Sequence, residues 1–259
     1  TLGVPLDANG ACDVAVFQVN GANPNLEPEK GKTINVGLVF DIARTVSASV
    51  DWWKIKKTNE ISTPTLDEAI AQGLFTRTGA RYNILTNLQN IASREVSGID
   101  LDGRIRLPGT PLGTISVRNL LTYYISDKER QSAGDELQQY LATYAKPRWR
   151  NALTVGSEVG AWNFGATWRT VDGFWDTDDA TPLAAGTRRV GKHEEMDLQV
   201  TYAGVKALEL SLGVKNVFDR MPPFSLTNAS DNQYTQMGFA ELYSARGRFF
   251  YLSAKYAFR

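Results

Sequence analysis

Residues 248–258 read RFFYLSAKYAF, and this stretch decides the fold. Apolar side chains occupy its even-numbered positions from residue 250 onward, and Tyr251, Ser253 and Lys255 lie between them. The side chains of a strand point alternately to opposite faces of a sheet. A period of two therefore predicts a β-strand with one apolar and one polar face.

The same alternation recurs along the chain and predicts about nine strands. Most of them are about ten residues long or longer, whereas strands of soluble proteins average about five or six. About ten residues is the length that a tilted strand needs to cross a bilayer, so the pattern indicates transmembrane strands. The expected strands cover residues 32–42, 46–56, 96–106, 113–126, 150–159, 161–171, 195–202, 208–215 and 248–258.

The connections between these strands are alternately short and long. Short turns are expected near residues 44, 109, 160 and 204. Outer-membrane barrels have short periplasmic turns and long extracellular loops. The sequence therefore predicts an all-β fold, an antiparallel up-and-down transmembrane β-barrel. The long segments between the hairpins are 62–88, 127–146, 172–192 and 219–246.

Composition narrows the classes of function. The 259 residues include 28 Lys and Arg and 28 Asp and Glu, so the formal net charge is zero. Nucleic-acid binding normally needs a clustered basic surface, and this balance gives no reason to expect it. No apolar run approaches the roughly 18 residues of a membrane helix. The opening residues, TLGVP, lack the basic start and apolar core of a signal peptide. Either the protein is cytoplasmic or an upstream segment is missing, and we expect the latter because the opening residues have the character of a loop.

Side chains that catalyse reactions or bind metals form no strong pattern. Asp176, Asp178 and Asp179 are either a cation site or, as we favour, a solvated charge cluster. His193 is the only histidine and cannot form a zinc site alone. Cys12, the only cysteine, is either an unreactive loop residue or the partner of an upstream cysteine. No catalytic triad, phosphate loop or catalytic carboxylate pair is evident, so we expect neither an enzyme nor a cofactor.

Charged residues alternate with the apolar positions of several strands. We therefore expect these side chains to point into the barrel lumen and to form salt bridges and hydrogen bonds there. The residues concerned are Asp100, Asp102, Arg104, Arg169 and Lys215.

The four long segments are where ligand contacts are expected, although no pattern selects a ligand-binding residue within them. Two of these segments also predict a short helix. Thr63 precedes a proline and an acidic first turn, which is typical of the start of a helix over residues 64–72. Residues 134–144 place Leu137, Tyr140 and Leu141 on one helical face.

Three segments carry a family resemblance. NPNLEPEK, residues 23–30, precedes a long alternating strand, GVKNVFDRMPP covers residues 213–223, and RGRFFYL covers residues 246–252. A fourth segment, IASREVSGID, residues 91–100, resembles a recurrent strand opening of the same family. In this order and spacing, the chain from Asn23 onward resembles the C-terminal half of TonB-dependent outer-membrane receptors.

The resemblance implies a barrel of roughly 22 strands with a plugged lumen. Residues 1–259 then form the C-terminal part of the barrel domain, and the N-terminal plug domain and its TonB box are absent. It also implies the cell outer membrane of a Gram-negative bacterium, where such receptors bind a scarce ligand. That ligand is often a ferric siderophore, haem, cobalamin or a carbohydrate. Import is driven by TonB, so the implied partners are TonB, the plug domain, outer-membrane lipid and the ligand.

The resemblance also assigns a role to the final strand. A terminal aromatic residue with apolar residues at alternate upstream positions is the signal read by the barrel-assembly machinery. Leu252, Ala254, Tyr256 and Phe258 match this signal. Arg259 departs from the family pattern, in which the aromatic residue usually ends the chain.

Two other functions remain open from the sequence. If the protein is a passive porin-type channel, we expect no plug, and we expect loops that fold inward and line an open pore. A soluble β-rich binding protein predicts that the apolar strand residues are buried against another layer. The membrane interpretation predicts instead that they face outward as an apolar belt. The side chains that discriminate are Ile34, Leu38, Trp162, Leu210 and Leu212.

Overall fold

The computed structural model describes residues 15–78, 81–130, 132, 135–227 and 240–258. Cys12 and Arg259, which the sequence singles out, lie outside the described residues. The chain divides into two compact units, which are described in turn. Unit 1 comprises Thr1–Lys32, Ile55–Glu95 and Lys128–Gln138, and unit 2 comprises Thr33–Lys54, Val96–Asp127 and Gln139–Arg259.

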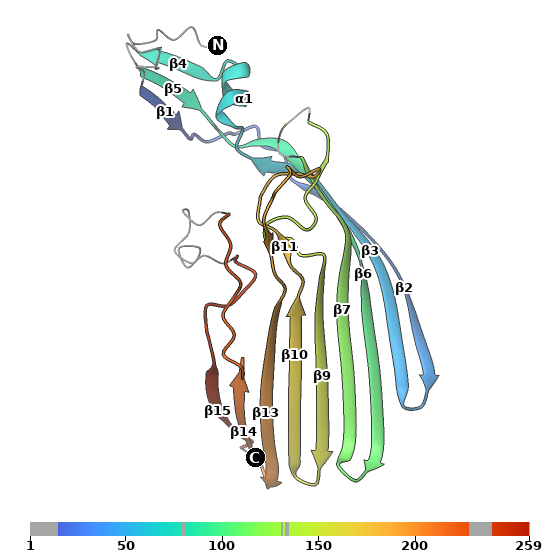
Figure 1. The fold of residues 1–259 in the computed structure, drawn as a ribbon. Coiled ribbons are helices and arrows are strands. Elements are labelled where there is room, and N and C mark those ends of the chain that lie inside the picture. Colours follow the sequence, from blue (N-terminus) through green and yellow to red (C-terminus); the bar gives the residue numbers. More distant parts are fainter. Residues whose placement is uncertain (1–14, 79–80, 131, 133–134, 228–239, 259) are drawn as a thin grey trace. The chain divides into compact units, whose positions relative to one another are not determined.

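The main sheet is an antiparallel meander (Figure 1). Nine strands follow one another in the order β15-β14-β13-β10-β9-β7-β6-β3-β2, and β8 pairs with β7. Sheet neighbours are also successive strands of this set along the chain, so the predicted up-and-down fold of about nine strands is confirmed. The bounds are β2 (Lys30–Ala43), β3 (Val46–Ser62), β6 (Gln89–Thr110), β7 (Gly113–Arg130), β8 (Gln138–Gln139), β9 (Trp149–Val159), β10 (Trp162–Val171), β13 (His193–Val205), β14 (Leu208–Lys215) and β15 (Phe249–Tyr256).

Several strands extend beyond their amphipathic part. β3 continues to Ser62, where the alternation predicts an end near Lys56, and β6 begins at Gln89 instead of Val96. The backbone ladder needs no apolar side chains, so it continues through polar residues that break the alternation. β15 ends two residues early, at Tyr256, and leaves Phe258 beyond the ladder.

Four two-residue turns join the hairpins at one end of unit 2 (Figure 1). Two of the four differ from the prediction. The turn expected at residues 108–111 lies at Pro111–Leu112, and the turn expected at residues 203–206 lies at Lys206–Ala207. The other two lie where the sequence predicts them, at Arg44–Thr45 and Gly160–Ala161.

The sheet of unit 2 has one apolar face. Cross-strand pairs such as Phe164 with Val200 and Leu212 with Leu252 place apolar side chains together on it. The five discriminating side chains are all on the surface, with exposed fractions between 38 and 62%. No second layer among the described residues covers them, so the burial predicted for a soluble protein is wrong. The residues are Ile34, Leu38, Trp162, Leu210 and Leu212.

Unit 1 contains a three-stranded sheet in the order β1-β5-β4. Its strands are β1 (Ala15–Val19), β4 (Phe75–Thr78) and β5 (Arg81–Leu85), and β1 runs parallel to β5. Tyr82 and Ile84 of β5 are buried, as is Ala69 of the helix α1 (Leu66–Ala71).

The predicted helix over residues 64–72 is present in shortened form as α1. Its N-cap is Thr65 and not Thr63, because Thr65 and Glu68 form a reciprocal capping box. The helix predicted over residues 134–144 is wrong. The side chain of Gln139 accepts hydrogen bonds from the backbone of Asp127 and Leu141, and the Tyr140 amide donates to the Asp127 carbonyl. These contacts use the amides that a helix would need.

The long loops of unit 2 have their own small core. β11 (Phe174–Trp175) pairs with β12 (Arg189–Val190), and Phe174 and Val190 pack with Ala240. Tyr144 lies edge-on to Phe174, with ring centroids 5.9 Å apart. The described helical residues include no helix long and apolar enough to cross a membrane.

Candidate functional site

A row of aligned residues that includes three glycines crosses the polar face of unit 2. The register aligns Gly156 of β9 with Gly165 of β10, then with Gln199 of β13. The row continues to Gly213 of β14 and Tyr251 of β15. Paired residues of neighbouring strands share a face. The Tyr251 ring covers Gly213 and the Ser116 hydroxyl lies close to Gly156, so of the three glycines only Gly165 leaves open space above the sheet. A depression lies on this face at Gly165.

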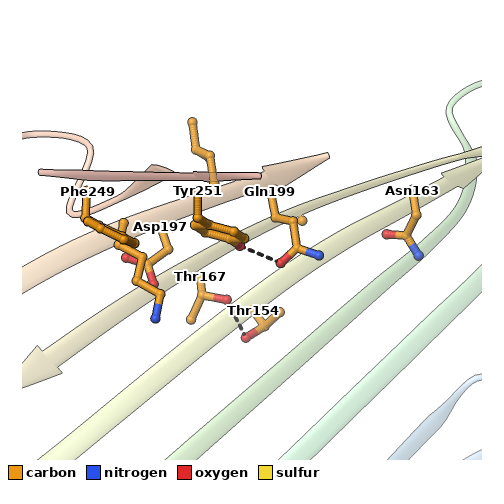
Figure 2. A pocket seen from close by; sticks show the side chains of 10 residues that line it. Thr154, Asn163, Thr167, Asp197, Gln199, Phe249 and Tyr251 are labelled. Carbon is orange, nitrogen blue, oxygen red and sulfur yellow. Dashed lines mark hydrogen bonds between the residues drawn. The ribbon is translucent and has the colours of Figure 1, made fainter. Parts of the chain in front are cut away.

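This depression is a cavity of about 570 Å³, which we call the lumen-face cavity (Figure 2). Tyr251 donates from its hydroxyl to Gln199 Oε1 over 2.8 Å, and the hydroxyls of Thr154 and Thr167 are 3.1 Å apart. The contacts hold the wall in place through side chains of four strands. The cavity is lined by Thr154, Asn163, Gly165, Thr167, Asp197, Leu198, Gln199, Lys215, Phe249 and Tyr251.

Two charged residues line the lumen-face cavity. The Asp197 carboxylate pairs with Arg169 and accepts a 2.9 Å hydrogen bond from the Asn216 amide. Lys215 also lines the cavity, and its ammonium group makes no hydrogen bond or ion pair with the described residues. The cavity can therefore offer hydroxyl and amide groups together with one ammonium group.

The other residues predicted to face the lumen do form ion pairs and hydrogen bonds on this face. Asp102 pairs with Arg104 and with Arg118, the latter at 2.9 Å. Asp100 accepts a 2.6 Å hydrogen bond from Thr122. The predicted ion pairs and hydrogen bonds are thus confirmed for these carboxylates, whereas their position in a barrel lumen stays a prediction. The prediction missed Arg118, although Arg118 alternates with the apolar residues of its strand in the same way.

Asp176 joins two loops of unit 2. Its side chain is only 1% exposed and pairs with Arg188. It accepts hydrogen bonds from the Ser225 hydroxyl and from the amides of Leu226 and Thr227. Burial raises the pKa of this carboxyl, but the hydrogen bonds and Arg188 outweigh burial and lower the pKa overall.

The sequence grouped Asp176 with Asp178 and Asp179 as a solvated cluster, and the structure separates them. Asp176 is buried, which corrects that expectation, because it satisfies the amides of a second loop. Asp179 is bonded to the Thr177 hydroxyl beside it. His193 is buried, with Nε2 3.1 Å from Glu195. In the part of the chain that the structure describes, no three His, Cys, Asp or Glu residues are grouped to hold a metal ion.

The residues that match the assembly signal lie on the apolar face of β15 or just beyond it. Leu252, Ala254 and Tyr256 pair with Leu212, Leu210 and Leu208 of β14. Phe258 follows the strand, is 90% exposed, and its ring lies 4.9 Å from that of Tyr256. All four are therefore accessible on the described chain.

The NPNLEPEK segment is attached to the strands of unit 1. The side chain of Asn90 accepts from the Glu27 amide and donates to the carbonyls of Glu27 and Asn59, each over 2.8 Å. The Glu29 carboxylate accepts from the Ile61 amide and pairs with Lys57 at 2.9 Å. This motif therefore fixes the start of β2 against β3 and β6, a role that the sequence alone did not reveal.

A meander of long strands with an exposed apolar face and a hydrogen-bonded polar face is the arrangement found in the walls of membrane β-barrels. The family comparison agrees and is more specific. The chain belongs to the TonB-dependent receptor-like β-barrel family, whose model matches residues 5–217. A search of curated proteins found no match to the chain.

Solved structures share the fold at low sequence identity. A mutant of the ferric enterobactin receptor PfeA from Pseudomonas aeruginosa is 18% identical, with a TM-score of 0.59, and the match covers 89% of this chain. The siderophore receptor PirA from Acinetobacter baumannii is 16% identical, with a TM-score of 0.64 over 92% of this chain. The FrpB iron transporter from Neisseria meningitidis is 12% identical, with a TM-score of 0.61 over 92% of this chain.

The chain spans only about a third of the length of these structures, namely 31% of PfeA and 33% each of PirA and FrpB. The comparison with them therefore concerns the fold of this part. The family consists of receptors and transporters and not of enzymes.

The lumen-face cavity and the Asp176 contacts were not predicted from the sequence. A signal existed for the cavity, because Asn163, Gly165 and Thr167 alternate with aromatic residues along β10. The alternation gives the face of each residue but not the register between strands, and only the register aligns the glycines. For Asp176, the sequence offers no signal that Leu226 and Thr227 are its partners.

Proposed function

We propose that the chain is the C-terminal part of the barrel domain of an energy-coupled receptor in the outer membrane of a Gram-negative bacterium. The receptor binds a scarce ligand at the cell surface and imports it with energy supplied through TonB. The observation that carries this proposal is the two-faced sheet of unit 2 in a chain of this family. The apolar face suits contact with lipid, and the polar face suits a lumen.

A plug domain and TonB are the proposed partners within this function. The lumen-face cavity supports a plug contact, because it is lined by the Asn163 amide and by Lys215, whose ammonium group has no partner among the described residues. Exposed Leu252, Tyr256 and Phe258 support a role in recognition by the barrel-assembly machinery.

A ferric siderophore is the ligand class that we propose first. The similar structures are named as a ferric enterobactin receptor, a siderophore receptor and an iron transporter. Haem, cobalamin and carbohydrate are the alternatives that the family allows.

Uptake by the full-length receptor tests this function. The receptor is expressed in a Gram-negative host that lacks its own siderophore receptors, and radioactive iron is supplied on a panel of siderophores. We expect accumulation with one of them in cells that have TonB and none above background in cells without TonB. Equal accumulation without TonB would establish a passive channel instead. Uptake of haem, cobalamin or a sugar alone would keep the energy-coupled receptor and replace the ligand class.

A further inference from the structure

Two motifs that the sequence singles out, GVKNVFDRMPP at residues 213–223 and RGRFFYL at residues 246–252, meet in unit 2. The first runs from the end of β14 into the loop, and the second leads from the loop into β15. The two motifs make two contacts. One lies in the loop, beyond the ends of β14 and β15, and the other lies within the sheet.

Asp219 makes the contact in the loop. Its Oδ1 accepts a 2.7 Å hydrogen bond from the Arg248 amide, next to the first residue of β15. Gly247 allows this approach, since a Cβ at that position would lie 2.6 Å from Asp219 Oδ1. A larger residue there would displace the carboxylate.

Asn216 positions Asp219. Its backbone has a positive φ of 49°, and its side chain is bonded to the Arg220 amide and carbonyl, both over 2.9 Å. The Asp219 amide donates to the Asn216 carbonyl over 2.9 Å. Asn216 is only 3% exposed and its own amide is held by Asp197, so this turn is fixed to the sheet.

Gly213 makes the contact on the sheet. It pairs with Tyr251, whose ring covers it so closely that a Cβ would lie 2.3 Å from the ring. Tyr251 reaches across β14 to Gln199 of β13. The Tyr251 side chain therefore contacts β14, the neighbour of β15 in the sheet, and also β13, the strand beyond it.

Contacts of this kind are needed to fix the register in which β15 pairs with β14. The four hairpins are joined by two-residue turns, which fix the register of their strands. The strands β14 and β15 are joined by residues 216–248 instead. Alternating side chains oppose a slip of one residue, because every apolar side chain would change face. A slip of two residues keeps every side chain on its face, so the alternation does not oppose it.

We propose that the two motifs form a register lock, made by Asp219 with Arg248 and Gly247 and by Gly213 with Tyr251. A slip of two residues breaks both contacts together. The lock therefore selects the one register in which Leu252 and Ala254 lie opposite Leu212 and Leu210. This inference concerns strand pairing and is independent of the ligand and of TonB.

Disulfide trapping in the full-length receptor tests the lock. In a Cys12→Ser background, Ser211→Cys with Ser253→Cys reports the observed register, because these residues are paired. Ser211→Cys with Lys255→Cys reports a slip of two residues in one direction, and Glu209→Cys with Ser253→Cys reports the opposite slip. The three pairs are oxidised in outer membranes, and the ratio of slipped to observed crosslinks is measured.

We expect Asp219→Ala and Gly247→Val each to raise this ratio about fivefold, the effect of one net hydrogen bond. Asp219→Asn keeps an acceptor for the Arg248 amide and should stay near the unaltered ratio. Asp179→Ala is the matched control, because among the described residues this loop carboxylate is bonded only to nearby Thr177.

Unchanged ratios in both Asp219→Ala and Gly247→Val would overturn the lock, as would a ratio for Asp219→Asn equal to that of Asp219→Ala. Loss of Asp219→Ala from the outer membrane, with Asp219→Asn and Asp179→Ala both recovered, would support the lock as a requirement for assembly. Loss of Asp219→Asn as well would reject the hydrogen bond as its basis.

Discussion

Replacing Asp176 by alanine should release the loop that carries Leu226 and Thr227. Asp176 is the acceptor for both amides, at 2.9 and 3.2 Å, and for the Ser225 hydroxyl. With the carboxylate gone, the described residues offer these donors no replacement. The change acts on the contact between two loops and leaves the ladder of the sheet intact.

The size of the effect follows from the contacts. A hydrogen bond to a charged acceptor is worth about 1.5 kcal/mol net at the low end of its range. The Ser225 and Leu226 bonds are short, whereas the Thr227 bond is long and adds little. Arg188 is 44% exposed, so it regains water when its partner is removed, and it keeps its 2.9 Å hydrogen bond to the Phe224 carbonyl. The two short bonds therefore give about 3 kcal/mol, or about a hundredfold in the opening equilibrium of the loop.

Hydrogen exchange measures this opening directly. The amides of Leu226 and Thr227 should exchange about a hundredfold faster in Asp176→Ala, while amides within β13 and β14 keep their rates. Asp179→Ala is the control, because that carboxylate bonds within its own loop and to nothing else in the described part of the chain. Unchanged exchange at Leu226 in Asp176→Ala would refute the reasoning, since the amide would then be protected by something other than this carboxylate.

Four further outcomes are expected. Because hydrogen bonds lower the pKa of Asp176 below its ordinary 3.8, the loop contact should persist as the pH falls to about 4 and be lost below it, as pH-dependent exchange can show. Tyr243→Phe removes a buried hydroxyl that has no partner among the described residues, so it should stabilise the protein by about 1 kcal/mol in denaturant unfolding. Burial raises the pKa of Tyr243 to about 12, so wild type should also lose stability relative to this variant between pH 10 and 12. Gly98→Val should cost about 1–3 kcal/mol, because a Cβ would meet the Trp53 ring at 2.6 Å, whereas Gly103→Val meets nothing within 4 Å, and thermal unfolding compares the two.

The strands and their faces were predictable because the local alternation of apolar and polar residues indicates both. Alternation along β10 or β14 needs no knowledge of distant residues, and the family motifs placed these strands in a barrel wall. The ends of β3 and β6 were not predictable in this way. Beyond Lys56 the ladder continues through polar residues, and the apolar period that reveals a strand disappears.

Sequence reasoning failed where one side chain satisfies a distant backbone. Gln139 bonds to the amide of Asp127, and this contact replaces the helix that the spacing of Leu137 and Leu141 predicts. Asp176 was classed with its acidic neighbours because its donors lie in another loop. Such contacts depend on which loops are adjacent in space, and the local pattern contains no information about that.

The bond between Asp219 and Arg248 affects how much the loop between these two residues can vary in length and sequence. It holds together the two ends of the intervening loop at the top of the sheet. Doubling the length of a flexible loop costs only about 0.6 kcal/mol once its ends are joined. The sequence between these ends can therefore lengthen, shorten or be exchanged while the wall beneath keeps its geometry. In the proposed receptor, this position is a natural place to graft a foreign peptide for display on the bacterial surface.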